Sequence, residues 1–453
     1  MSNLPPEVLT EVFNHLSRES KQQCLLVCKT WYAVALYLLN RSIVIKNSND
    51  ATILIGKIFQ QNGFIDGNDV HHMSFQSKYN SNDFINRAVF IRILVSCKNL
   101  KTLDFTNENN SHRYLQYLDQ YKNTVPLNNL QAIYAPYSCS QYYITLTHHY
   151  RGRMNQLSLQ IYNKSFKEAP GIDGFSSYLK HFSFLKTLNL RFKRRVFLHD
   201  LLRACPLLET LQLFNFDNDN PLEIFNNNEP NERITNQEIT NSKLKSLIIT
   251  SSMVNQELFE YLLDRTSQLY QLSINGRCSN PAIFNEAFSA FVNYNRTFSI
   301  KHLTFDEHVS VSQELITGLN ASFSHLAKIE FAKCIFSKVI DQHQNLKLGF
   351  SSLDIHYLFI DFINVLINRP GINVVSLEIK QNNNHDIKYF QRTSKWKANN
   401  MFIKKTNKHY ISNSASEKRI ISRHLSILKI DTNTLHCLRL NCNNSFKQII
   451  TLN

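Results

Sequence analysis

A short pattern of apolar residues recurs along most of this chain, and it restricts the possible folds more than any other feature of the sequence. The pattern is apolar-x-x-apolar-x-apolar, and its plainest copies begin at Leu100, Leu185, Leu208, Leu244 and Leu269. With weaker copies included, the central residues from Met73 to Leu377 follow one another at intervals of 23 to 36 residues. Alternation over so few residues predicts a short strand with one buried face in each copy.

Between these strands the apolar spacing changes to three- and four-residue steps, which predicts helices near 84–95, 254–263, 281–292 and 357–367. A single unit of helix, turn and strand has two apolar edges, so only stacked copies can share a buried core. The sequence resembles the leucine-rich repeat in a long, irregular form. The resemblance implies an α/β solenoid with parallel strands on its concave face and helices on its convex face. A mixed α/β domain with alternating strands and helices is the alternative.

The first 40 residues have a different pattern, which predicts three short helices. Pro5 and Pro6 suit the first turn of a helix, because proline lacks an N–H that would be unpaired there. Helical spacing then continues through Val8, Leu9, Val12, Phe13 and Leu16. Two further helices are expected, over 21–27 and 31–39. So small a helical core is expected to leave apolar side chains that need a partner protein.

This segment resembles the F-box, and the resemblance is carried by Leu4-Pro5-x-Glu7-Val8-Leu9, by Leu16 before a polar break, and by Val27-Cys28-x-x-Trp31. It implies a three-helix module that docks on a Skp-type adaptor and through it on a cullin scaffold. The residues that match the family pattern, and would contact the adaptor, are Leu4, Pro5, Glu7, Val8, Leu9, Leu16, Val27, Cys28 and Trp31. One departure is Lys21-Gln22-Gln23, where the family often has leucine, and it could weaken adaptor binding. The alternative is a helical cap on the repeats.

With 453 residues and 43% hydrophobic content, the chain can hold one small and one large domain. We expect a helical module at 1–40, a connecting strand and helix at 41–69, the repeats at 70–380, a basic insertion at 381–424 and a terminal repeat or cap at 425–453. No apolar stretch approaches the roughly 18 residues of a membrane span. Glu7 and Glu11 interrupt what would be the apolar part of a signal peptide. We therefore expect an intracellular protein, cytoplasmic or nuclear, that does not enter a membrane.

The net charge of +15 is concentrated in one segment. Residues 388–424 contain ten Lys and Arg against the single acid Glu417, which accounts for +9. This composition indicates one of two things. The segment is either a solvated, partly disordered insertion, or it binds RNA through Lys and Arg side chains that alternate with the aromatic residues Trp396, Phe402 and Tyr410. We expect no nucleic-acid binding elsewhere.

The predicted concave face is mixed and polar. In each repeat, the residues between and just after the last two apolar positions point toward it. Acids outnumber bases such as Lys328 there, which argues against phosphate-backbone binding on this face. The residues that we expect to contact a protein target are Asp104, Asn189, Arg191, Gln212, Gln271, Asn275, His302, Asp306, Glu330, Asp354 and Glu378.

The chain shows no motif of a known catalytic or cofactor site. It has no P-loop, no dinucleotide-binding glycine motif, no HExxH and no GxSxG. Its nine cysteines form no CxxC pair, and Cys97 and Cys205, at equivalent places in two repeats, are interpreted as buried packing residues. His71-His72 and His148-His149 are interpreted as loop or strand-edge residues.

We therefore expect no catalytic residue, metal or cofactor on this chain. The sequence predicts a non-catalytic substrate receptor of an SCF-type ubiquitin ligase, in which the F-box docks the adaptor and the repeats hold a target. The alternative is a leucine-rich-repeat scaffold that binds RNA or another acidic partner through 388–424.

Overall fold

The computed structural model describes residues 4–59, 65–76, 84–136, 138, 140–161, 174–193, 196–215, 242–276, 281–290, 297–336, 345–361, 376–381, 386–392, 402–405, 427–441 and 447–452. The chain divides into two compact units, Met1–Leu190 and Arg191–Asn453. This division falls inside the span 70–380 that the repeat pattern assigns to one domain.

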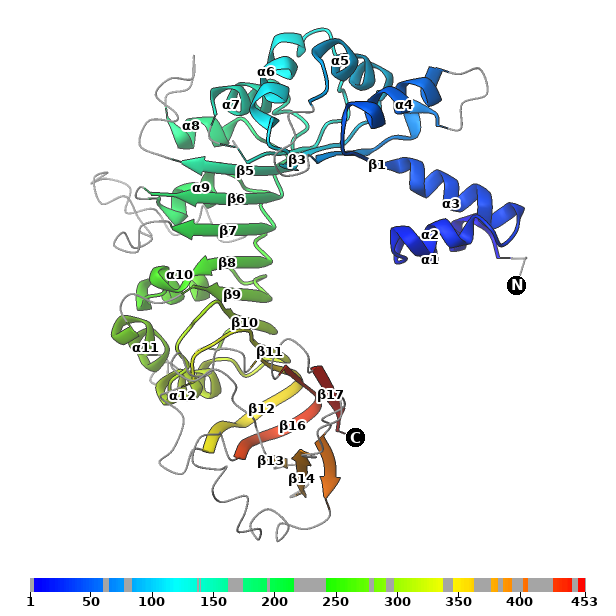
Figure 1. Ribbon diagram of the computed structural model, residues 1–453. Coiled ribbons are helices and arrows are strands. Elements are labelled where there is room, and N and C mark those ends of the chain that lie inside the picture. Colours follow the sequence, from blue (N-terminus) through cyan, green and yellow to red (C-terminus); the bar gives the residue numbers. More distant parts are fainter. Residues whose placement is uncertain are drawn as a thin grey trace. The chain divides into compact units, whose positions relative to one another are not determined.

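The first unit begins with three helices, α1 (Pro6–Asn14), α2 (Arg18–Cys24) and α3 (Lys29–Arg41), shown in blue in Figure 1. A parallel sheet follows in the order β1-β2-β3-β4. Its strands are β1 (Ser42–Ile45), β2 (His72–Gln76), β3 (Thr102–Asn107) and β4 (Ala132–Tyr134), and the later strands of the unit are β5 (Gln156–Ile161) and β6 (Thr187–Phe192), which reaches the boundary. The helical elements between and after these strands are α4 (Ser48–Phe59), η1 (Gly67–Asp69), α5 (Arg87–Ser96), α6 (Ser111–Tyr121), α7 (Gln141–His149) and α8 (Phe175–Lys180).

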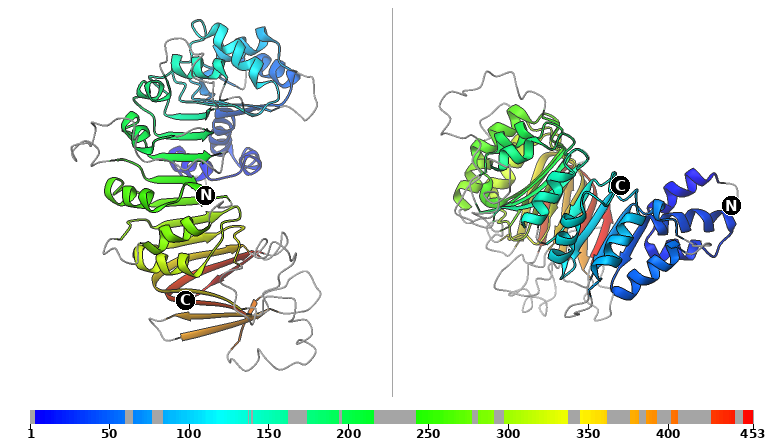
Figure 2. Two further views of the ribbon diagram at one scale, coloured as in Figure 1. Left: turned by 90° about the vertical axis from the view of Figure 1, so that its left-hand side faces the viewer. Right: turned by 90° about the horizontal axis from the view of Figure 1, so that it is seen from above.

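The second unit contains the remaining repeats. Its strands are β7 (Thr210–Asn215), β8 (Ser246–Thr250), β9 (Gln271–Asn275), β10 (His302–Asp306), β11 (Lys328–Phe331), β12 (Asn345–Asp361), β13 (Ser376–Gln381), β14 (Asp386–Arg392), β15 (Phe402–Lys405), β16 (Ile427–Asn441) and β17 (Lys447–Thr451). Its helical elements are α9 (Leu198–Ala204), η2 (Ser251–Met253), α10 (Gln256–Arg265), α11 (Pro281–Ser289) and α12 (Gln313–Ser322). Figures 1 and 2 show α10, α11 and α12 on one side of strands β8 to β11. Strand pairing from β7 to β12 is parallel.

The strand registers confirm most of the repeat pattern, because the central apolar residues of successive copies lie opposite one another. In the first unit Met73 faces Leu103, which faces Ile133. In the second unit the central residues Leu211, Leu247, Leu272, Leu303 and Ile329 face one another in the same way on successive strands. All of these side chains are at most 1% exposed. The predicted α/β fold class, a helical module followed by parallel-strand repeats, is therefore confirmed.

Two local features repeat with the strands. Helices α5, α7, α10 and α12 begin after Asn86, Ser140, Asn255 and Ser312, whose side chains each accept a hydrogen bond from the backbone N–H three residues on. Cys97 and Cys205 end α5 and α9 with similar backbone angles, and both are buried as predicted. Stacked rings fill the core behind the strands, as in Phe75, Phe105 and Tyr114.

The prediction of a helix at 357–367 is wrong over 357–361, which belong to β12; residues 362–367 lie outside the described residues. Leu358, rather than the predicted Leu353, continues the ladder opposite Ile329. A register shift between Phe350 and Asp354 explains the error, because it places a second apolar alternation in the same long strand.

Strand order departs from chain order at the end of the second unit. Strand β16 pairs in parallel with both β12 and β13, and so lies between them. Strands β14 and β15 extend the sheet beyond β13 in antiparallel pairs, and β17 pairs antiparallel with β16. The predicted insertion at 381–424 thus contains two strands; its remaining residues, apart from Gln381 at the end of β13, lie outside the described residues.

Candidate functional site

The N-terminal helical module begins where the two prolines predict. Pro5 is the N-cap of α1 and Pro6 its first residue, and the N–H of Leu9 donates to the Pro5 carbonyl at 3.1 Å. Ser17 caps α2 by accepting a hydrogen bond from the Ser20 N–H at 3.1 Å. These caps set the ends of two short helices that propensity alone would leave marginal.

The interior of the module is small. Its buried residues are Leu9, Phe13, Cys24, Val34, Ala35 and Leu38, and the half-buried Leu16, Leu25 and Trp31 pack against them. The rings of Phe13 and Trp31 meet edge to face, with centroids 5.1 Å apart. Each helix contributes to this core, so the module has one defined packing arrangement.

Several apolar side chains of the module point away from this core. On α1, Val8 and Val12 lie four residues apart on one helical face and are 44% and 49% exposed, and Leu4, just before the helix, is 47% exposed. In the turn between α2 and α3, Leu26 is 82% and Val27 58% exposed. We call these five residues the exposed apolar set. Single exposed apolar residues are ordinary, but five aliphatic ones among the 37 described residues of 1–40 make the module a candidate interaction surface.

The nine residues that the family resemblance assigned to adaptor contact differ in their exposure to solvent. Leu4, Pro5, Glu7, Val8 and Val27 are exposed, whereas Leu16, Cys28 and Trp31 are half-buried. Leu9 is 2% exposed and forms part of the core, so its side chain orients α1 rather than facing a partner. Sequence reasoning missed Val12 and Leu26 as surface residues, although both lie in the apolar runs that it identified.

The second candidate surface is the face of the second-unit sheet that is opposite α10–α12. Strand pairing brings Gln271 beside His302 and Asn275 beside Asp306, as the repeat pattern predicts. Burial and the neighbouring Lys328 lower the pKa of His302. These side chains are all half-buried, and they form a polar surface rather than a deep cavity.

Other predicted target-binding residues lie apart from this group. Asp104 and Asn189 belong to the first unit, and Arg191 and Gln212 lie on β6 and β7. Asp354 lies beyond the β12 irregularity, where it accepts hydrogen bonds from Asn433 at 2.7 Å and Thr434 at 2.9 Å. Glu378 lies on β13, beyond β16.

Three further residues on this face, Tyr357, Phe359 and Arg439, were missed because 357–367 was predicted as a helix and β16 was not expected beside β12. Lys328 lies over the Tyr357 ring, with its Nζ 5.3 Å from the centroid, and also pairs with Glu330 at 3.1 Å. Arg439 lies over the Phe359 ring at 5.4 Å. The registers place Glu330, Phe359 and Arg439 in one row across three strands. We call Lys328, Glu330, Tyr357, Phe359 and Arg439 the aromatic-cation group.

In the described residues, no group of three or more His, Cys, Asp or Glu side chains could hold a metal ion. His148 and His149 lie at the end of α7, not in a loop or strand as expected, and burial lowers both pKa values. Among the helices described, none is long and apolar enough to cross a membrane.

The basic segment predicted to bind RNA is described only at 388–392 and 402–405. These residues belong to β14 and β15, and Lys388 is 9% exposed. The other basic residues of 388–424 lie outside the described residues, so the RNA-binding hypothesis stays a prediction.

Comparisons with known proteins found a matching family and similar solved structures. Residues 1–46 match the family described as F-box-like, and this range covers α1–α3 and β1. A comparison with functionally curated proteins finds no match. The chain is similar in structure to the leucine-rich repeat-containing protein LegL7 from Legionella pneumophila, with 16% identity and a TM-score of 0.33, over 64% of this chain and 82% of that chain. It is also similar to a chain in the crystal structure of a TLR13–ssRNA13 complex, with 14% identity and a TM-score of 0.30, over 71% of this chain and 47% of that chain.

Proposed function

We propose that this protein is a substrate receptor of an SCF-type ubiquitin ligase, in which the N-terminal module docks a Skp-type adaptor and the repeats bind a target protein. The observation that carries the proposal is the exposed apolar set on a module that matches the F-box-like family. A protein with these two parts acts as an interaction adaptor.

Docking on the adaptor would cover apolar side chains that the chain itself leaves in water. Covering Leu4, Val8, Val12, Leu26 and Val27 contributes free energy at about 25 cal/mol per Å² of apolar surface removed from water. The core residues Leu9 and Phe13 hold α1 in place, so the surface is formed before the partner arrives. A preformed surface loses less conformational entropy on binding.

The repeats supply a second surface with a different chemistry. The aromatic-cation group offers two rings, two bases and one acid on three adjacent strands. Aromatic and arginine side chains are the types that contribute most to protein interfaces. We place the target-binding site here, with Gln271, Asn275, His302 and Asp306 on the neighbouring strands as its polar surroundings.

The mechanism in this proposal is positioning. A receptor that holds adaptor and target together raises the local concentration of the target near the ligase, up to the millimolar range for short connections. No acid, base or nucleophile of this chain takes part in the ubiquitin transfer. A cullin scaffold joined through the adaptor and an intracellular location belong to the same proposal.

Co-purification with a Skp-type adaptor tests the proposal. The double variant V8Q/V12Q replaces two exposed apolar side chains of α1 by amides, and glutamine is a better helix former than valine. The matched control is V95Q/I283Q, which changes residues of similar exposure, 41% and 47%, on α5 and α11. We expect the first variant to lose adaptor capture and the control to keep it. Equal capture by wild type and V8Q/V12Q would contradict the proposal.

A further inference from the structure

The first unit contains an open hollow of about 750 Å³ that neither proposed interaction surface uses. It lies where three successive helices end, and its lining comes from the turn after α6 (Lys122–Asn128), the end of α7 with the following turn (His149–Arg153), and His181 after α8. A volume of this size suits a small molecule.

The charges around the hollow are predominantly positive. Lys122, Arg151 and Arg153 line it together with two histidines, and no aspartate or glutamate is among the described lining residues. The turns hold the bases through the backbone and neighbouring amides: Arg151 donates to the His148 carbonyl at 2.9 Å, and Arg153 donates to Asn128 Oδ1 at 3.2 Å. A guanidinium has five N–H donors, so each arginine retains donors for a ligand.

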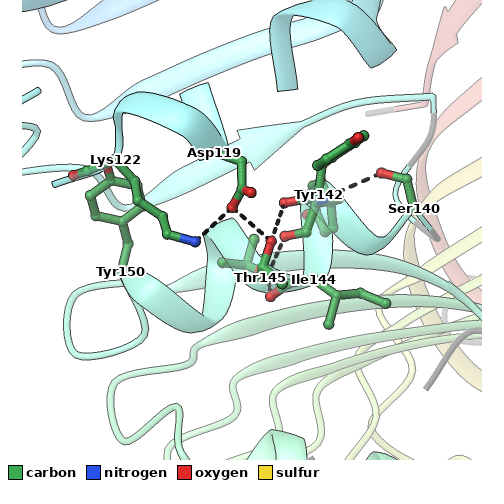
Figure 3. Close-up of polar contacts among 9 residues, drawn as sticks. Asp119, Lys122, Ser140, Tyr142, Ile144, Thr145 and Tyr150 are labelled. Atoms are coloured by element: carbon green, nitrogen blue, oxygen red, sulfur yellow. Dashed lines mark hydrogen bonds and ion pairs between the residues drawn. The ribbon is translucent and has the colours of Figure 1, made fainter. Parts of the chain in front are cut away.

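Figure 3 shows how the third base is held. Lys122 Nζ pairs with Asp119 Oδ1 at 2.8 Å, and the same oxygen accepts a hydrogen bond from Thr145 at 2.8 Å. Tyr150, whose hydroxyl faces the Lys122 carbonyl at 3.5 Å, lies beside the lysine. Asp119 therefore compensates Lys122 in part, and the unbalanced charge comes mainly from the two arginines.

A second observation agrees with an unbalanced positive field. Burial and then the cations Lys122 and Arg151 lower the pKa of His149, with Asp119 opposing them. His148, beside His181 at a centroid distance of 5.1 Å, has its pKa lowered by burial and then by Arg151, His181 and His149. Of these, His149 lines the hollow, and its neutral imidazole can donate a hydrogen bond to a ligand without adding negative charge.

We propose that this hollow binds a small molecule that carries a phosphate group. Arginine side chains match phosphate oxygens in geometry as well as charge, and a tetrahedral dianion can accept hydrogen bonds from two arginines and an imidazole at once. A single carboxylate would leave most of these donors unused. The site belongs to the first unit and does not depend on the proposed ligase function.

The test uses the full chain, with pyrophosphate as the probe in isothermal titration calorimetry at moderate salt. The variant R151Q/R153Q removes the two fixed charges but keeps polar side chains of similar length. The matched control is K98Q/K301Q, which removes two exposed bases elsewhere, one of them in the corresponding turn after α5. We expect saturable binding by wild type and control, and a Kd at least roughly tenfold weaker for R151Q/R153Q.

Three results would overturn the assignment: no saturable binding of pyrophosphate, equal losses in the two double variants, or tight binding of a phosphoserine peptide without binding of pyrophosphate. The last would indicate that the phosphate comes from a protein. Adaptor capture by R151Q/R153Q should stay at the wild-type level, so failure here and failure of the proposed function are distinguishable.

Discussion

The ring of Trp31 meets the ring of Phe13 edge-on, at a centroid distance of 5.1 Å and an angle of 73° between the planes. Phe13 is 1% exposed, whereas Trp31 is half-buried. The tryptophan therefore links the interior of the helical module to its surface.

Core and surface residues of the module should therefore have different effects on its stability. Phe13→Ala should lower the free energy of unfolding by about 3–5 kcal/mol, because it leaves a cavity under Trp31. V8Q/V12Q should change it by less than roughly 1 kcal/mol, because both side chains are largely exposed and neither belongs to the core. Urea unfolding followed by Trp31 fluorescence in a Trp396→Phe background measures both. Similar losses for the two variants would mean that Val8 and Val12 are structural.

Two glycines in helices should respond in opposite directions to alanine. A Cβ on Gly56 of α4 would have no neighbour within 4 Å, so Gly56→Ala should stabilise α4 by about 0.5–1 kcal/mol. A Cβ on Gly318 of α12 would lie 2.3 Å from the Phe288 carbonyl oxygen of α11. Gly318→Ala should therefore destabilise this helix pair by about 1–3 kcal/mol. Hydrogen exchange should show slower exchange in α4 for the first variant and faster exchange in α11 and α12 for the second.

The two repeat cysteines should resist alkylation. Burial raises the pKa of Cys97 and of Cys205 to about 12. At pH 8 only about one thiol in ten thousand is then a thiolate, which is the reactive form. Iodoacetamide should leave both unmodified in the folded protein and modify both in urea, as read by peptide mass spectrometry. Rapid modification of either in the folded protein would show that its helix end opens readily.

Charge reversal in the aromatic-cation group should remove target binding. K328E/R439E replaces the two bases that lie over Tyr357 and Phe359, so it disrupts both stacked pairs. Proteins that co-purify with the wild type under proteasome inhibition should be lost from this variant, while the adaptor is retained. K98E/K180E makes the same change in net charge at exposed residues elsewhere and should keep both. Unchanged co-purifying proteins would move the target site off this face.

His149 should make pyrophosphate binding more favourable as the pH falls. His149 has a lowered pKa in the free protein because of burial, Lys122 and Arg151, and a bound anion would offset the two cations and raise that pKa. A pKa raised by the ligand means proton uptake by His149 on binding, so from pH 7.5 toward pH 5.5 the affinity of the wild type should increase relative to that of His149→Gln, which shares the protonation of the ligand itself. Calorimetry in two buffers of different ionisation enthalpy measures the uptake. In His149→Gln the pH dependence should be reduced.

The parts of the fold that the sequence predicts are those decided by local burial. Leu272, Leu303 and Ile329 face one another because each is the central apolar residue of its own short alternation. The same logic failed at Leu353 and Leu358, where one long strand contains two alternations and only pairing with β11 selects between them. The position of β16 depends on a partner strand distant in the sequence, which no local pattern encodes.

The candidate surfaces were predictable to a similar degree. Pro5, Val8 and Val27 lie on the surface, as the family resemblance implies, whereas Leu9 is buried. The family pattern contains both core and surface residues, and the sequence alone does not distinguish them. Phe359 and Arg439 became neighbours only through the β12 and β16 pairing. The hollow near Arg151 arises from three turns, and turns lack the periodicity that reveals strands and helices.

Strand β12 pairs with β16, which is synthesised much later, so β12 remains without this partner while the chain is being made. While a nascent chain is shorter than 441 residues, the long edge of β12 has no complete partner, although the strands before it can already stack. An unpaired strand edge invites pairing with other chains. Ribosomes that stop early, or proteases that remove residues 427–453, would thus yield a product in which β12 keeps an uncovered edge and which is prone to aggregate.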